Sequence, residues 1–263
     1  MIEAVVNVSE GRDLGIVGQI GAAAGKLLLD THSDPFHHRS VYTLAGEAEE
    51  IELATLALSR RAVELVDLSG HRGVHPRLGA VDVVPFVPYA EPYEVALAAR
   101  DRFAAALSSE EVPCFLYGPE RTLPEIRRRA WVSLSPDLGP KAPHPTAGAT
   151  CVGVRGVLVA YNLVIESTIE RARGIARALR GPSVRALGLP VGGEVQVSFN
   201  LIEPDRVGPA QVYDEVERLV PIRRSELVGL VPGPVLERIP RARWRQLDLA
   251  EERTVEARLA ALR

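Results

Sequence analysis

The chain has 263 residues, with 31 basic and 34 acidic side chains and a net charge of −3 at pH 7. A composition that is 46% hydrophobic and 25% charged is typical of a folded globular protein and excludes general disorder. The net charge also argues against a dedicated nucleic-acid-binding protein, which needs a basic excess to neutralise phosphates.

The first half alternates strand-like and helix-like segments. Apolar, β-branched runs predict strands, and apolar residues at helical spacing predict helices. The predicted strands cover 2–7, 27–30, 39–46, 80–88 and 114–118, and the predicted helices cover 12–25, 47–66 and 91–108. This alternation favours an α/β sandwich of helices on a sheet.

A proline-rich stretch, 119–148, follows, and we expect it to connect two halves with one short helix at 122–129, because prolines interrupt regular elements. In the second half the predicted strands cover 149–155, 157–165, 184–189, 193–202 and 225–231, and the predicted helices cover 167–180, 209–220 and segments from about 232 and 248. The pair Gly192-Gly193 between two apolar runs indicates a hairpin turn.

Two features bear on the cellular setting. Cys114 and Cys151 do not form a C-x-x-C pair and are too few for a disulfide framework. The N-terminal segment lacks the pattern of a secretory signal, and no apolar run reaches the roughly 18 residues that span a bilayer. We therefore expect a cytoplasmic protein that does not enter the membrane.

All six histidines precede residue 145 and fall in three segments that we interpret as loops, namely 31–38, 67–78 and 136–155. The sharpest motif is HRGVHPRLGAVD (71–82), in which a neutral imidazole at His75 can accept a proton near pH 7 and return it. His71 and His75 have the i, i+4 spacing of zinc ligands on a helix, which leaves a metallohydrolase as an alternative. Gly73 and Pro76 make a helix there unfavourable, so we expect no metal.

Other common catalytic motifs are absent from the sequence. It contains neither a GxSxG motif nor a P-loop, so neither a serine hydrolase nor ATP binding is indicated. The glycines of the third loop permit close backbone approach to a flat ligand, although a stiff linker would have the same composition.

Several motifs, taken in order, resemble the formiminotransferase domain of the formiminotransferase-cyclodeaminase family. They are NVSEGRD, DPFHHRSVYTLAG, GVHPRLGAVDVVPFVP, FLYG, PDLGP, HPTAGATCVGVR, QVSFNLI and SELVGLVPG, spread over about residues 2–235. The resemblance implies two α/β subdomains, 1–146 and 147–263. Each would be a mixed or antiparallel sheet with ferredoxin-like strand order, covered by helices on one side, with folate bound between them.

The resemblance also implies the activity of a glutamate formimidoyltransferase of histidine catabolism, which moves a formimino group from N-formimino-L-glutamate to N5 of tetrahydrofolate. Tetrahydrofolate is then a co-substrate, no metal is required, and the partners are these small molecules and a second copy of the chain in a homodimer. No nucleic acid or membrane partner is implied.

The matching motifs place the site residues. His75 stands where the family has its catalytic histidine, so the resemblance implies a general acid/base there. The folate-contacting stretch of the family falls on Gly139, Pro140, Lys141, Ala142, Pro143, His144, Pro145, Thr146, Ala147 and Gly148. Because Lys26 and Lys141 are the only lysines, we expect arginines to bind the substrate carboxylates, and the loop candidates are Arg39, Arg77 and Arg155.

Departures from the family pattern keep two alternatives open. The stretch 127–140 is shorter than in the family, and His38 replaces the usual asparagine before Arg39. One alternative is a formyltransferase that uses 5-formyltetrahydrofolate, and the other is a folate-binding protein without transfer activity.

Overall fold

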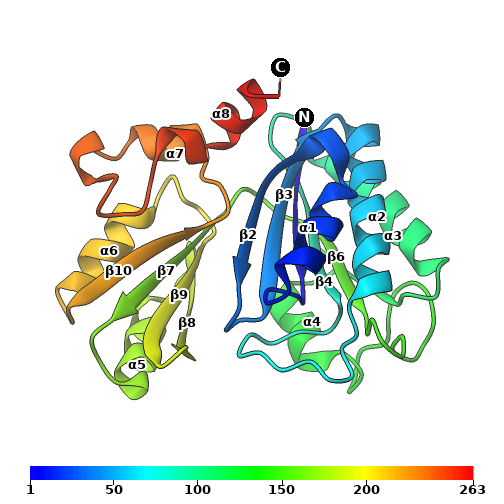
Figure 1. Ribbon diagram of the computed structural model, residues 1–263, viewed down its shortest axis with the longest axis horizontal. Coiled ribbons are helices and arrows are strands. Elements are labelled where there is room, and N and C mark those ends of the chain that lie inside the picture. Colours follow the sequence, from blue (N-terminus) through cyan, green and yellow to red (C-terminus); the bar gives the residue numbers. More distant parts are fainter. Residues whose placement is uncertain (263) are drawn as a thin grey trace. The chain divides into compact units, whose positions relative to one another are not determined.

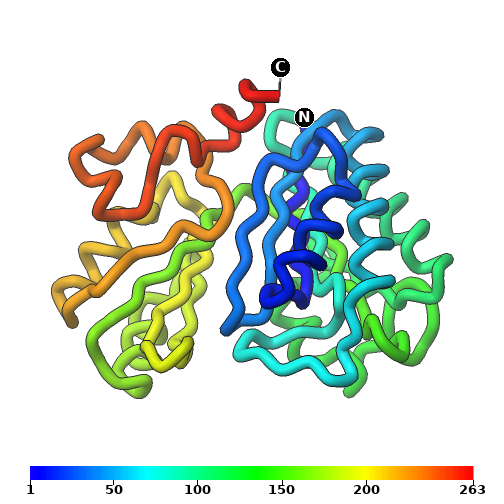
Figure 2. The backbone as a smooth tube through the Cα atoms, viewed as in Figure 1, coloured from blue at the N-terminus to red at the C-terminus, as the bar shows by residue number. Residues whose placement is uncertain are grey.

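The computed structural model describes residues 1–262 and divides into two compact units (Figure 1). The first unit is Met1–Arg155, and the second begins at Gly156 and continues through the rest of the described chain. Each unit is formed by one continuous segment, so the backbone passes from the first to the second only once (Figure 2). No helix within residues 1–262 is long and apolar enough to cross a membrane.

The first unit is built on a six-stranded sheet with the order β2-β3-β1-β4-β6-β5. Its elements in chain order are β1 (Ile2–Val8), α1 (Leu14–Ala22), β2 (Leu28–Asp34), β3 (Arg39–Gly46), α2 (Ala48–Leu65), β4 (Val81–Pro88), α3 (Tyr93–Ser108), β5 (Cys114–Tyr117), α4 (Leu123–Arg129) and β6 (Thr150–Val154). The segment from β1 to β4 has the predicted ferredoxin-like order, and β6 pairs in parallel with both β4 and β5.

Alternate residues of the first sheet pack against helices on opposite faces. Val84 and Phe86 of β4 belong to the core that α1, α2 and α3 cover, and the rings of Phe86 and Phe103 lie 5.6 Å apart. On the other face, Phe115 and Cys151 pack with Ile126 of α4. The predicted one-sided helix layer therefore describes α1–α3, whereas α4 covers the opposite face near β5.

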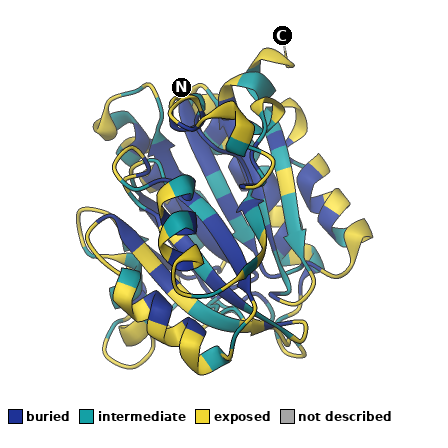
Figure 3. Ribbon diagram, turned by 90° about the vertical axis from the view of Figure 1, so that its left-hand side faces the viewer, coloured by how far each residue is buried: buried dark blue, intermediate teal, exposed yellow. Residues whose placement is uncertain are grey.

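The second unit has a four-stranded antiparallel sheet with the order β10-β7-β9-β8, which is again ferredoxin-like. Its elements are β7 (Val159–Ile165), α5 (Ile169–Leu179), β8 (Val184–Val191), β9 (Glu194–Leu201), α6 (Pro209–Glu217), β10 (Ile222–Val228), α7 (Gly233–Glu237) and α8 (Val255–Ala260). Both residues of the predicted hairpin turn have positive φ, 57° at Gly192 and 84° at Gly193. In Figure 3 most of the strand residues are buried, whereas the helices are exposed on their outer faces.

Two differences from the sequence prediction concern strands. β6 belongs to the first sheet, so the first unit extends to Arg155, whereas the predicted division is at 146/147. The reason is its parallel pairing with distant strands, such as Val83 with Cys151, which no local pattern indicates. β2 also runs on to Asp34, so His32 lies in an edge strand and not in a loop.

Candidate functional site

A buried carboxylate stands at the centre of the candidate site. Asp82, the second residue of β4, is fully buried, and its side chain accepts hydrogen bonds from Arg39 Nη1 at 2.6 Å, Arg127 Nη1 at 2.8 Å and the Leu78 N–H at 2.7 Å. Burial alone would raise the pKa of Asp82, but the two guanidinium groups outweigh it and hold that pKa well below its usual range. Asp82 is therefore ionised, as a buried charge with two cationic partners should be.

Three elements of the first unit bring the two arginines to Asp82. Arg39 is the first residue of β3, and its Nε donates to Asn7 Oδ1 of β1 at 3.1 Å. Arg127 lies in the last turn of α4, which begins with a capping box in which the Thr122 N–H donates to Glu125 Oε2 at 2.7 Å. The cap fixes where the helix starts and hence which side chain faces the sheet.

His75 lies half-buried in the loop before β4. Its Nδ1 is 2.7 Å from the Pro76 carbonyl oxygen. A carbonyl only accepts, so Nδ1 carries the proton and Nε2 has the lone pair. Burial first, and then the nearby charge of Arg39, lower the pKa of His75 to about 3. The imidazole is therefore neutral near pH 7, and its Nε2 makes no hydrogen bond within residues 1–262.

A second loop, 35–38, is tied to the loop of His75. Arg77 Nη2 donates to the carbonyl oxygen of His75 at 2.6 Å and to that of His37 at 3.4 Å, and the rings of His37 and His75 lie 6.0 Å apart. Arg77 also contacts the His71 ring. A Cβ atom at Gly73 would collide with the His37 carbonyl, so the two backbones approach too closely for any side chain there.

His38 adopts a positive φ of 50°. Its Nε2 lies 3.1 Å from Glu10 Oε1 and its Nδ1 3.0 Å from the Arg72 carbonyl, and its ring stacks on His71 at 3.8 Å. Burial would raise the pKa of Glu10, but hydrogen bonds from backbone N–H groups and the charge of His38 lower it. His38 thus links the loop after β1 to the loop of His75.

The predicted folate stretch contacts the segment that follows His75. The Ala80 N–H donates to the Ala147 carbonyl at 2.8 Å, and the Ala149 N–H donates to the Leu78 carbonyl at 3.0 Å. Gly148 has φ of 69°, and a Cβ atom there would collide with the Leu78 carbonyl. The loop of His75 and the segment after it therefore contact both 35–38 and the end of the predicted folate stretch.

Two polar side chains of the stretch serve its own conformation. His144 Nδ1 accepts a hydrogen bond from the Ala147 N–H at 3.0 Å, and Lys141 Nζ donates to the Pro136 carbonyl at 2.9 Å. Gly139 has φ of 82°, in the region that favours glycine. These contacts hold the stretch as a defined loop on the first unit.

The three predicted arginines do not gather at one place. Arg39 and Arg77 lie beside His75 and feel each other's charge. Arg155 follows the end of β6, and its N–H donates to the Phe86 carbonyl at 3.3 Å. Since β4 and β6 are parallel and Asp82 lies at the start of β4, Arg155 is about 16 Å further along the strands.

Arg127 was not predicted as a site residue from the sequence. Its partner Asp82 is 45 residues away in the chain, so no local spacing links the two. The available signal was the capping box at Thr122 and Glu125 before the string RRR (127–129). That pattern predicts a helix that carries one arginine toward the sheet and the others toward solvent.

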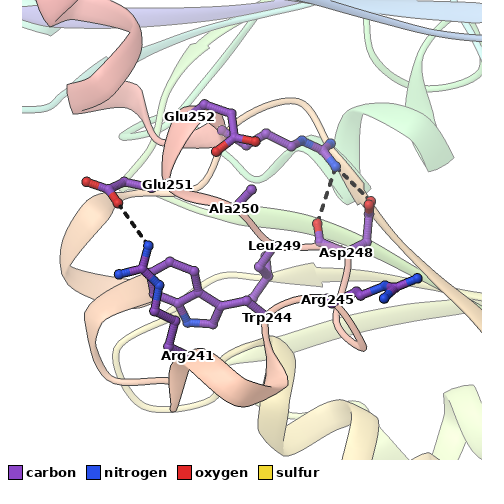
Figure 4. Close-up of a pocket in the computed structure, with 9 residues that line it drawn as sticks. Arg241, Trp244, Arg245, Asp248, Leu249, Ala250, Glu251 and Glu252 are labelled. Carbon is purple, nitrogen blue, oxygen red and sulfur yellow. Dashed lines mark hydrogen bonds and ion pairs between the residues drawn. The ribbon is translucent and has the colours of Figure 1, made fainter.

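The second unit contains a cavity of about 480 Å³ (Figure 4). Its lining residues are Arg241, Trp244, Arg245, Asp248, Leu249, Ala250, Glu251, Glu252 and Arg253. Asp248 pairs with Arg253 at 2.7 Å, and Arg241 lies 3.8 Å from Glu251. No histidine or cysteine lines this cavity, and within residues 1–262 no three metal-ligating side chains form a cluster. The candidate acid/base chemistry lies in the first unit.

The fold and the site together define an α/β protein of two ferredoxin-like units, the first of which carries a neutral histidine beside a cationic cluster. Residues 1–155 match the family model described as the formiminotransferase domain, N-terminal subdomain. The chain belongs to the formiminotransferase family.

Curated relatives agree with that assignment. A glutamate formimidoyltransferase of Streptococcus pyogenes is 33% identical over 90% of both chains, and one of Thermoplasma acidophilum is 32% identical over 90% of this chain and 89% of its own. The formimidoyltransferase-cyclodeaminase of Sus scrofa is 35% identical over 88% of this chain. The chain spans about half the length of this last, fused relative.

Proposed function

We propose that the protein transfers a formimino group from N-formimino-L-glutamate to N5 of tetrahydrofolate, with His75 as general acid and base. The observation that carries the proposal is the state of His75, whose Nδ1 is held by Pro76 while the Nε2 lone pair is available beside Arg39 and Arg127. The names of relatives that align along most of this chain support the same reaction.

In the proposed reaction, the N5 lone pair attacks the formimino carbon while the N5 proton passes to His75 Nε2. The bond between that carbon and the glutamate nitrogen then breaks, and the imidazolium returns the proton to the leaving nitrogen. One C–N bond forms and one breaks, so no oxidant or reductant is required. A neutral imidazole is the state that the first step needs.

The cationic cluster supplies a place for a substrate carboxylate. Arg39 and Arg127 share one buried carboxylate, that of Asp82, and the charges of both arginines act on His75. The side chains of Arg39 and Arg127 are 11% and 20% exposed, so both reach the surface of the site. We assign the donor carboxylate to these two arginines and to Arg77, because guanidinium groups bind carboxylates in a bidentate manner.

For the folate we propose contacts with 139–148. The support is the backbone pairing of that loop with the segment after His75, together with the glycines that let a flat ring approach. Arg155 remains a proposed contact at the far end of the sheet, suited only to an extended ligand with an anionic tail.

The deciding experiment is a transfer assay. The purified full chain is incubated with N-formimino-L-glutamate and tetrahydrofolate, and glutamate release is followed. We expect turnover that is lost by about 10²–10⁴-fold in His75→Ala, whose half-buried loop position should leave the fold intact. Turnover only with 5-formyltetrahydrofolate would favour a formyltransferase, and calorimetric folinate binding without any turnover would favour a binding protein.

We further propose a metal-free, cytoplasmic homodimer. The cytoplasmic assignment is supported by Cys114 and Cys151, which are free and buried. The dimer rests on the family resemblance. Unchanged transfer activity after dialysis against a chelator, and the mass measured by light scattering, test the metal and dimer parts of this proposal.

A further inference from the structure

Two large apolar side chains are exposed beside the candidate acid/base. Phe36 is 51% exposed and Val74 is 41% exposed, and the Val74 N–H donates to the Phe36 carbonyl at 3.3 Å. Val74 directly precedes His75, and Phe36 directly precedes His37, whose ring lies 6.0 Å from that of His75. We call Phe36 and Val74 the apolar pair.

The backbone around the apolar pair is held in place. Asp34 Oδ1 accepts the N–H groups of Phe36 and His37, both at 2.7 Å, which closes a turn. Arg12 Nε donates to the Pro35 carbonyl at 2.8 Å, and Arg77 joins this turn to the loop of His75. The apolar pair is thus a preformed surface, which binds a flat ligand at less entropic cost than a mobile loop would.

We infer that the apolar pair is a specificity-determining contact for the ring system of the folate, and not for the glutamate donor. This inference rests on the proposed function. If His75 takes the proton from N5, that atom lies within hydrogen-bond reach of Nε2, and a fused ring of that size must extend over neighbouring residues. The pair is apolar and includes an aromatic ring, which suits a flat heterocycle, whereas the donor is aliphatic and anionic.

The test compares Phe36→Ala, Phe36→Tyr and Val74→Ala with a matched control, Leu53→Ala, which removes a side chain that is 67% exposed on α2. We expect Phe36→Ala to raise the KM for tetrahydrofolate about tenfold and Val74→Ala about threefold. In both variants the KM for N-formimino-L-glutamate and kcat should be unchanged. Phe36→Tyr should retain the wild-type KM, as should Leu53→Ala.

Calorimetric titration with folinate separates this inference from the proposed reaction. If the wild type binds folinate without turnover, and Phe36→Ala binds it about tenfold more weakly, the inference stands while the transfer proposal fails. A KM for tetrahydrofolate within twofold of wild type in Phe36→Ala overturns the inference, as does a change confined to the donor KM. An altered elution volume of Phe36→Ala in size-exclusion chromatography would overturn the inference by assigning the apolar pair to an interface between copies. If the wild type does not bind folinate, the inference is overturned as well.

Discussion

Replacing Asp82 by asparagine should destabilise the first unit strongly. The carboxylate is fully buried and accepts four hydrogen bonds, three from the guanidinium groups of Arg39 and Arg127 and one from the Leu78 N–H. Asparagine is neutral and turns an N–H₂ group toward guanidinium donors, so two largely buried cations lose their counter-charge. Removing one partner of a buried ion pair costs about 3–5 kcal/mol, and we expect a loss of that size in the free energy of unfolding.

Tryptophan fluorescence allows the first unit to be followed by itself. The chain has two tryptophans, Trp131 in the first unit and Trp244 in the second. The Trp131 ring packs edge-on against Phe115 at 5.1 Å, so in a Trp244→Phe background its emission should change when the first unit unfolds. Urea titrations of this background with and without Asp82→Asn give the difference, and the thermal midpoint should fall by roughly 6–20 °C.

Asp101→Asn is the matched control. Asp101 lies in the same unit and pairs with Arg100 at 2.6 Å, as short as the contact between Arg39 and Asp82, but its side chain is 53% exposed. The Arg100 side chain is only 3% exposed, but it also pairs with Glu120 at 2.7 Å, so it keeps a counter-charge when the exposed Asp101 is neutralised. We therefore expect a loss below about 1 kcal/mol, and this variant should unfold nearly as the background does. If Asp82→Asn lost no more stability than Asp101→Asn, burial would not be what makes the Asp82 cluster strong, and the reasoning would be refuted.

Three further predictions use the same groups. The pKa of Asp82 is lower in the folded state than its unfolded value of about 4, so ionised Asp82 stabilises the fold above that pH and this contribution is lost below it. In urea titrations, the free energy of unfolding should therefore fall more steeply from about pH 5 to 2 in the wild type than in Asp82→Asn. Since burial and Arg39 lower the pKa of His75 to about 3, the acidic limb of kcat/KM should lie well below pH 6.5; a limb near 6.5 would contradict the assigned environment. Arg127→Lys should raise the KM for N-formimino-L-glutamate about tenfold, whereas the exposed neighbour in Arg128→Lys should not; equal values for both variants would remove Arg127 from the substrate site.

Much of the fold follows from local patterns. A run of apolar, β-branched residues predicted β4, and the two glycines predicted the turn between β8 and β9. The short helix α4 was predicted over 122–129 and spans Leu123–Arg129. The ferredoxin-like order came from the family resemblance, because pairing between distant strands leaves no local signal. The membership of β6 in the first sheet escaped for the same reason.

The loops that carry the candidate site could be predicted from the sequence, but the cluster of charged side chains could not. The motif around His75 and the glycines of 139–148 are readable from sequence because they are contiguous. The cluster of Asp82 with Arg39 and Arg127 joins residues 43 and 45 positions apart, and only the folded chain brings them together. The pKa of His75 depends on that cluster and on burial, so the residue type alone could not supply it.

The capping box of α4 determines where the chain can tolerate an insertion or a deletion. Five positions separate Thr122 from Arg127, and each residue of an α-helix advances the side chain by roughly 100°. An insertion or deletion between them would turn Arg127 away from Asp82, whereas one after the helix, within 130–137, leaves its rotational phase untouched. A change of length within 130–137 should therefore keep the contact between α4 and β4, whereas one within 122–127 should break it.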